Sequence, residues 1–151
     1  MVAKTEKSCV TIRRARTTDA RRIAKLAREL GYPSTPSEVA KRVRKLRTSR
    51  QDALFVAESP GSGIVGWTHV SVTNAVEVGT RAELNGLIVA DGQRSLGAGA
   101  LLLEAAENWA RKRGCPAMSV HSNVIRERAH KFYLRNGYEH YKTQKAFQKT
   151  L

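Results

Sequence analysis

Residues 91–99 are the stretch of this sequence whose types and spacing most directly predict chemistry. They read Asp-Gly-Gln-Arg-Ser-Leu-Gly-Ala-Gly, follow an apolar segment and precede residues 100–113, which have helical periodicity. The first amides of a helix have no helical acceptor, and the helix dipole adds roughly half a positive charge at that end. This junction therefore predicts an anion site able to hold a diphosphate. Gly97 and Gly99 permit close approach, and Arg94 can pair with a phosphate oxygen.

Two glycines ahead of a helix are also typical of a plain structural turn, and this alternative stays open. The segment is not a P-loop, because no Gly-Lys-Ser/Thr is present, and it lacks the third spaced glycine of the dinucleotide fingerprint. The pattern therefore favours an anion site that belongs to neither of these phosphate-binding classes.

The elements that must position this loop are predicted from apolar periodicity and turn residues. Thr17-Thr18-Asp19 and Ser37 are predicted helix caps, and Gly31 ends the first helix. Further helices are expected at 100–113 and 126–135, and strands at 9–13, 53–58, 64–72, 82–89 and 117–121, with closing strands in 138–147. This order predicts one α/β domain over residues 1–151.

Length and composition limit the class of protein. The chain has 151 residues, of which 41% are hydrophobic, enough for one domain with a substantial core. It contains no apolar run of about 18 residues, and residues 1–7 are polar, which predicts a cytoplasmic protein without a membrane span or signal peptide. Cys9 and Cys115 lack the spacing of a zinc site or a disulfide framework, so no metal is expected and Cys115 is predicted to be a small buried residue.

Basic residues are concentrated in the first third of the chain. The formal net charge is +14, and residues 1–50 contain 15 of the 27 Lys and Arg but only 4 of the 13 Asp and Glu. Such a positive field favours polyanions, whether nucleic acid, an acidic surface or a phosphorylated cofactor. A solvated basic face explains the same charge, and it is the favoured interpretation for the helix that follows Ser37.

Two segments of the chain resemble signatures of the GCN5-related N-acetyltransferase (GNAT) family. The first is Leu87-Ile88-Val89 followed by Arg94-Ser95-Leu96-Gly97-Ala98-Gly99, which is similar to the acetyl-CoA motif Gln/Arg-x-x-Gly-x-Gly/Ala. The second is Asn123, Ala129, Phe132-Tyr133 and Gly137-Tyr138. The resemblance implies an α/β fold, with a GNAT-like mixed, mostly antiparallel six- to seven-stranded sheet flanked by about four helices and splayed between its central strands.

The resemblance also implies an activity, the transfer of an acetyl group from acetyl-CoA to a primary amine by direct attack in a ternary complex. Acetyl-CoA would lie along the strand at 82–89, with its pyrophosphate on the amides of 94–100 and Asn123 facing it across the splay. The implied binding residues are Leu87, Ile88, Val89, Arg94, Ser95, Leu96, Gly97, Ala98, Gly99, Ala100, Asn123 and Tyr133.

The transfer needs a base, because an amine with a pKa of about 10 is mostly protonated at neutral pH. Glu83 is the candidate, since its distance before the Leu-x-Val segment resembles that of the general base in histone-acetylating members. Period-two alternation puts Glu83 on one strand face with Asn85, Leu87 and Val89, unless a bulge at Asn85-Gly86 reverses the order. The alternatives are a surface glutamate paired with Arg81 or another cation, or His121 as the base.

The leaving thiolate gains from a proton donor, and Tyr133 matches the tyrosine that this family uses as general acid. Without the motif, Phe132 and Tyr133 would be interpreted as core aromatics at helical spacing, and this alternative stays open.

Acceptor and partners are less well defined by the sequence. The basic N-terminal helices would repel aminoglycosides and polyamines and favour a neutral or acidic amine, although Glu77 and Glu83 can make a local acidic pocket. An apolar C-terminal strand ending near Phe147 suits pairing across a homodimer interface. Two other functions remain alternatives, a basic nucleic-acid-binding module and an acetyl-CoA-binding protein without turnover.

Overall fold

The computed structural model describes residues 9–151, apart from the side chain of Ser95, one of the predicted acetyl-CoA-binding residues. Residues 1–7, on which the expectation about a signal peptide rests, lie outside this part. The chain divides into two compact units, one ending at His121 and the other running from Ser122 to Leu151.

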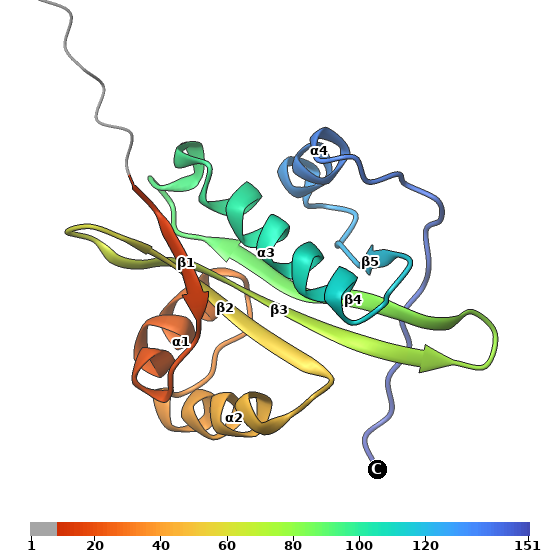
Figure 1. Cartoon of the computed structure of the whole chain (residues 1–151), viewed down its shortest axis with the longest axis horizontal. Helices are drawn as coiled ribbons and strands as arrows, with labels where there is room; N and C mark the ends of the chain where they lie inside the picture. Colours follow the sequence, from red (N-terminus) through yellow and green to blue (C-terminus); the bar gives the residue numbers. More distant parts are fainter. Residues whose placement is uncertain (1–8) are drawn as a thin grey trace, which may run out of the picture. The chain divides into compact units, whose positions relative to one another are not determined.

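The first unit is built on a five-stranded sheet with the order β1-β2-β3-β4-β5 (Figure 1). Four strands are antiparallel to their neighbours, and β5 alone runs parallel to β4. The strands are β1 (Thr11–Arg14), β2 (Asp52–Ser59), β3 (Gly63–Ala75), β4 (Gly79–Val89) and β5 (Met118–Val120). Each matches an expected strand within a few residues, so the predicted mixed, mostly antiparallel sheet is confirmed.

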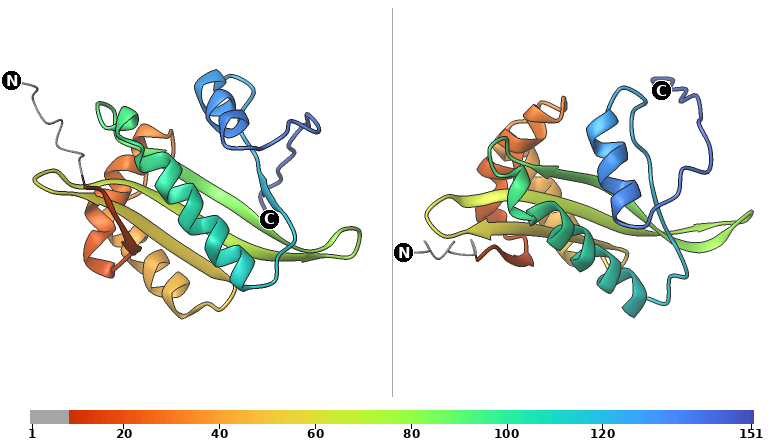
Figure 2. Two further views of the ribbon diagram at one scale, coloured as in Figure 1. Left: turned by 45° about the horizontal axis from the view of Figure 1, so that its top comes forward. Right: turned by 90° about the horizontal axis from the view of Figure 1, so that it is seen from above.

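Helices cover both faces of this sheet, α1 (Ala20–Glu29) and α2 (Pro36–Thr48) on one and α3 (Ala98–Lys112) on the other, as the views in Figures 1 and 2 show. The core on the α1/α2 face joins buried side chains of both helices to Leu54, Val56 and Ile88. The core on the α3 face joins Leu102 to Val89 and other strand residues. Because α3 begins soon after β4 ends, the predicted anion-binding loop lies at one end of the central strands.

Local capping explains where the helices begin. The cap of α2 is Thr35 and not Ser37 as predicted, because the Thr35 hydroxyl accepts the Glu38 amide and the Glu38 carboxylate accepts the Thr35 amide. Asp19 precedes α1 as expected, but its carboxylate accepts the Arg16 amide and two hydrogen bonds from Arg13. Asp19 thereby ties the start of α1 to strand β1.

The second unit contains α4 (Glu127–Arg135), and this helix too was expected from the sequence. The strands expected in 138–147 are absent from the described residues, which leaves five strands in place of the six to seven predicted. A strand is stabilised by ladder bonds and by a buried face, and residues 139–151 have neither, since all of them are exposed. Among the described helices, none is long and apolar enough to cross a bilayer.

Candidate active site

Strand β4 is paired on both edges along only part of its length. Its parallel ladder with β5 joins Ala82 to Met118, Glu83 to Ser119 and Leu84 to Val120. Beyond Leu84, no strand among the described residues pairs with this edge, while the opposite edge stays bonded to β3 up to Val89. The predicted splay is therefore present, and the edge of residues 85–89 lacks a strand partner among the described residues, whose place an extended ligand can take, although its Val89 carbonyl already accepts from Arg94.

A β-bulge at Asn85 changes which side chains share a face of β4. His69 of β3 lies opposite Gly86, but the next residue, Val70, lies opposite Leu84, so Asn85 is unmatched. Directly opposed residues share a face, which places Glu83 with Ser71 and Leu87 with Thr68, on opposite sides of the sheet. The expected common face of Glu83, Asn85, Leu87 and Val89 is therefore wrong, and the bulge that would reverse the alternation is present.

Leu87 and Val89 face α3, whereas Ile88 faces α1 and α2. Glu83 shares the face of Ile88, on the side opposite α3.

The carboxylate of Glu83 pairs with a histidine. Its Oε1 lies 2.8 Å from Nδ1 of His121, the residue that follows β5. The side chain of Glu83 is 30% exposed and that of His121 is 66% exposed, so the pair is open to solvent on the histidine side. The two residues that were rival candidates for the base are therefore in direct contact, and Arg81 is not the partner of Glu83.

Glu83 belongs to a polar row that crosses the sheet. Asp52 of β2 lies opposite Ser71 of β3, and Ser71 lies opposite Glu83. Asp52 accepts from the Ser49 hydroxyl at 2.6 Å and its other oxygen lies 2.8 Å from Nε2 of His69. Burial alone would raise the pKa of Asp52, but these two hydrogen bonds outweigh it and hold the pKa below its ordinary value.

The Asp52–His69 pair was not expected from the sequence. The two residues lie on different strands, and only the register of β2 and β3 brings them together. No local motif signals such a pair. The carboxylates of Asp52 and Glu83 lie on strands that β3 separates, so their backbones are about 10 Å apart at an interstrand spacing of roughly 4.8 Å.

The loop after β4 forms the anion-binding geometry predicted from its glycines. Gly97 adopts φ +78°, which favours glycine, and caps α3. The first helical bond runs from the Leu101 amide to the Gly97 carbonyl, so the amides of residues 98–100 have no helical acceptor. A Cβ at Gly97 would meet no other atom within 4 Å. The Cβ position of Gly97, just before these donors, is therefore open.

Arg94 lies in a short 3-10 turn, Arg94–Leu96, between β4 and α3. Its Nε donates to the Val89 carbonyl at 3.2 Å, and its Nη1 lies 2.9 Å from the carboxylate of Asp91, which is 85% exposed. The guanidinium therefore anchors the loop to the end of β4. Contact with a phosphate would use the remaining Nη2 or displace Asp91.

The second unit contains the other predicted site residues. The Asn123 side chain accepts the Ile125 amide at 3.1 Å, an Asx turn ahead of α4. The ring of Tyr133 makes edge-to-face contacts with Phe132 at 5.3 Å and Tyr138 at 5.7 Å. Burial raises the pKa of Tyr133, with a smaller opposing effect from Arg126, so its phenol stays protonated at neutral pH. Aromatic packing and proton donation are both compatible with this arrangement.

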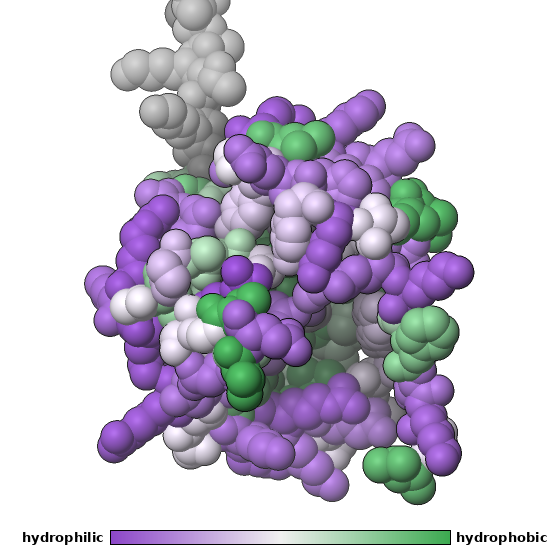
Figure 3. Space-filling model, turned by 90° about the vertical axis from the view of Figure 1, so that its right-hand side faces the viewer, coloured by the Kyte–Doolittle hydropathy of each residue, from purple (hydrophilic) through white to green (hydrophobic). Residues whose placement is uncertain are grey.

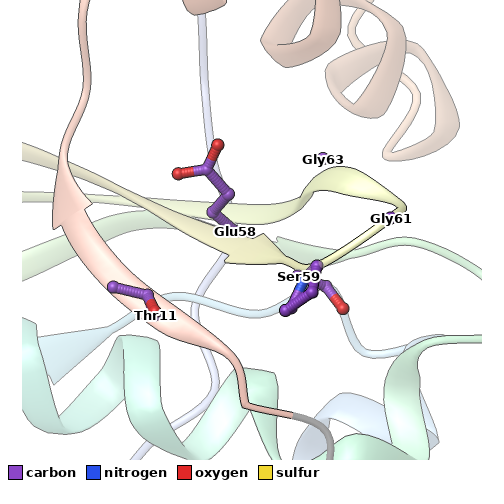
Figure 4. A pocket seen from close by; sticks show the side chains of 6 residues that line it. Thr11, Glu58, Ser59, Gly61 and Gly63 are labelled. Carbon is purple, nitrogen blue, oxygen red and sulfur yellow. The ribbon is translucent and has the colours of Figure 1, made fainter.

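Other features of the described residues do not coincide with these groups. An open hollow between Thr11 of β1 and the β2–β3 turn is lined by Glu58, Ser59 and Gly61, and it includes none of the predicted site residues (Figure 4). The face shown in Figure 3 is mostly hydrophilic, with hydrophobic side chains in small separate groups. Across residues 9–151, no three histidine, cysteine or acidic side chains gather in a way that would hold a metal ion. Cys115 is half-buried and unpaired.

A match to a known protein family identifies the family of this chain. A model of the Acetyltransferase (GNAT) family matches residues 18–138. The chain belongs to this family. Among curated GNAT relatives, it is 28% identical over 134 residues to the uncharacterized N-acetyltransferase YhfO of Bacillus subtilis, covering 86% of this chain and 90% of the relative. It is also 28% identical over 108 residues to an aminoglycoside N(6')-acetyltransferase type 1 of Klebsiella aerogenes, covering 70% of this chain and 71% of the relative.

A solved structure supports the same fold. Aminoglycoside N-acetyltransferase AAC(6')-Iy, crystallised in complex with CoA, superposes with a TM-score of 0.84 at 19% identity and full coverage of both chains. The GNAT match makes the chain an N-acetyltransferase with acetyl-CoA as its acetyl donor. The free edge of β4 and the open amides of α3 fit such a donor.

Proposed function

We propose that acetyl-CoA binds along the unpaired half of β4, with its pantetheine arm beside residues 85–89 and its pyrophosphate on the amides of residues 98–100. The observation that carries this proposal is the short β4–β5 ladder, which ends at Leu84 and leaves an edge that an extended amide-containing chain can complete. The αL conformation of Gly97 and the space in front of it support the pyrophosphate position.

In the transfer, Glu83 takes a proton from the acceptor ammonium, directly or through a water, with His121 stabilising the carboxylate's position. The free amine nitrogen attacks the thioester carbonyl carbon, a C–N bond forms and the C–S bond breaks. Tyr133, whose raised pKa keeps the phenol protonated, gives its proton to the leaving thiolate as general acid, and the surplus proton of the acylated nitrogen returns to the phenolate through solvent. A large share of the rate comes from holding amine and thioester together, so no single one of these groups is indispensable.

The acceptor we propose is a primary amine, with its ammonium group next to Glu83. Although the chain carries a net charge of +14, the polar row adds the Asp52 carboxylate on the same face of the sheet, which makes this region locally favourable for a cation. One relative is named for acetylating aminoglycosides, which motivates including them beside peptide and small neutral amines in a screen.

We also propose that the protein is a single-domain, cytoplasmic enzyme that can form a homodimer. One acetyltransferase domain covers both units, since the family match runs across the boundary at His121. Two unpaired cysteines are compatible with the reducing cytoplasm. The exposed Phe147, in a segment without ladder partners among the described residues, is available for a homodimer contact.

The test of the donor site is a calorimetric titration with acetyl-CoA in moderate salt. Gly97→Asn should weaken binding at least about tenfold, because the new side chain fills the space in front of the amides while asparagine tolerates the αL conformation. Gly61→Asn is the matched control, since Gly61 has φ +79° and the same open surroundings but lies in the β2–β3 turn. Equal affinities of the two variants, or no binding by the folded wild type, would contradict the proposed position.

Turnover is tested separately from binding. Release of free CoA thiol in the presence of a suitable primary amine is the expected result. Tight binding of acetyl-CoA without thiol release for every amine in the screen would instead favour the non-catalytic alternative.

A further inference from the structure

Four arginines from different parts of the first unit are neighbours: the charges of Arg47 and Arg113 both act on Arg14, and the backbone of Arg50 contacts Arg113. Arg14 ends β1, Arg47 lies in the last turn of α2, Arg50 lies between α2 and β2, and Arg113 follows α3. The Arg113 guanidinium donates a hydrogen bond to the Arg50 carbonyl, which connects the end of α3 to the α2–β2 connection. All four side chains are exposed. Arg14, Arg47, Arg50 and Arg113 together form the arginine cluster.

Two members of the arginine cluster are held against aromatic rings. The guanidinium of Arg14 lies over the ring of Phe55 at 5.5 Å, and that of Arg113 lies over the ring of Trp109 at 5.0 Å. Such stacking lowers the entropy lost when a ligand binds, because the planar groups are already oriented. The cluster is therefore partly preorganised.

The positive charge of the cluster is not neutralised within the described protein. Among residues 9–151, no ion pair links any of its four members to a carboxylate. Burial lowers the pKa of Arg14, and the nearby charges of Arg113 and Arg47 lower it further. Cations in the last turns of α2 and α3 stabilise the dipoles of these helices. Helix-dipole stabilisation explains one basic residue at the end of each helix, but it does not explain why basic residues from two helices and a strand are neighbours.

We propose that the arginine cluster is a second binding site, for the phosphodiester backbone of nucleic acid, independent of the acetyl-transfer site. The planar fork of arginine matches phosphate oxygens in a bidentate manner, and several such forks on neighbouring, exposed arginines suit a chain of regularly spaced phosphates. Guanidiniums already cover the rings of Phe55 and Trp109, so these rings do not offer free faces for stacking on bases. Binding therefore proceeds through the phosphodiester backbone of the nucleic acid, without sequence preference.

The test measures binding of a fluorescent DNA duplex of about 20 base pairs by anisotropy at several salt concentrations. Four phosphate contacts predict a slope of about −3.6 in log K against log salt, or roughly 150-fold weaker binding at about 200 mM than at about 50 mM. Arg47→Gln/Arg50→Gln removes two contacts, so the slope should fall to about −1.8, or roughly 12-fold. Neither side chain has a described partner whose loss would disturb the fold.

The matched control is Arg21→Gln/Arg28→Gln, which removes the same charge from exposed positions of α1. This control should keep the slope of the wild type, and neither variant should change thiol release with a small amine. An equal loss of slope in both variants would overturn the proposal, because binding would then follow net charge alone. Failure to bind the duplex at low salt would overturn it too. If poly-glutamate displaced the labelled duplex as effectively as unlabelled duplex does, the result would overturn the nucleic-acid proposal and favour an acidic protein as the partner.

Discussion

Replacing Glu83 with glutamine should lower kcat about 100-fold or more, while the KM for acetyl-CoA stays within about twofold of the wild type. Glutamine keeps the shape of the side chain but cannot accept the ammonium proton. Glu83 lies on the sheet face away from Leu87 and Val89, which are close to the proposed donor, so the loss should not extend to donor binding.

The contribution of His121 follows from its exposure. With 66% of the His121 side chain in solvent, its 2.8 Å contact with Glu83 resembles an exposed ion pair, worth at most about 1 kcal/mol. That energy corresponds to at most about a fivefold loss of kcat for His121→Gln. Once Glu83 is glutamine, the histidine has no carboxylate to orient. The double variant should therefore match Glu83→Gln within about twofold.

The assay is thiol release at saturating acetyl-CoA with the best amine from the acceptor screen. Glu104→Gln, at an exposed position of α3, is the control and should behave as the wild type. Refutation takes either of two forms: a Glu83→Gln enzyme within about threefold of the wild type, or a loss in His121→Gln as large as that in Glu83→Gln. The second result would make His121 the base.

Four further changes test the fold and the proposed acid. Thr35→Ala should lower the unfolding free energy by about 1 kcal/mol through loss of the α2 capping box, whereas Ser37→Ala should be neutral in the same thermal melts. Leu102→Ala, at a fully buried position, should cost about 2–5 kcal/mol in urea unfolding. Burial opposes ionisation of Asp19, but hydrogen bonds from Arg13 and the Arg16 amide hold its pKa below the ordinary value. Its stabilisation is therefore complete above about pH 4 and lost as pH falls through the lowered pKa, so urea midpoints should fall over this range in the wild type and less in Asp19→Asn. Tyr133→Phe should lower kcat about tenfold without changing the KM for acetyl-CoA, and an unchanged kcat would favour the aromatic-packing interpretation.

Periodicity predicted the elements of the first unit because each carries its own local signal. The apolar spacing of α1 and the turn at residues 60–63 both act over a few neighbouring residues. The cap of α2 was also recoverable, since Thr35 and Glu38 form a Thr-x-x-Glu box with proline between them at the first helical position. Choosing Ser37 overlooked that spacing.

The features that the sequence did not specify depend on partners far along the chain. The bulge at Asn85 arises from the pairing of β4 with β3, and only the β4–β5 register brings His121 to Glu83. The expected strands in 138–147 fail for a related reason: alternation describes a candidate strand, but ladder bonds must come from another segment. The loop at Gly97 was predictable because its backbone conformation depends on glycine itself.

The bulge at Asn85 also limits how this chain can change in length. Removing the unmatched Asn85 would restore the regular ladder with β3 and leave Glu83 and Leu87 on their present, opposite faces. An insertion in the turn beyond Ala75 would leave both faces as they are, because it lies outside the ladder between β3 and β4. Length variation among close homologues should therefore be tolerated in that turn and limited within residues 83–87 to loss of the unmatched residue, whichever amine they acetylate.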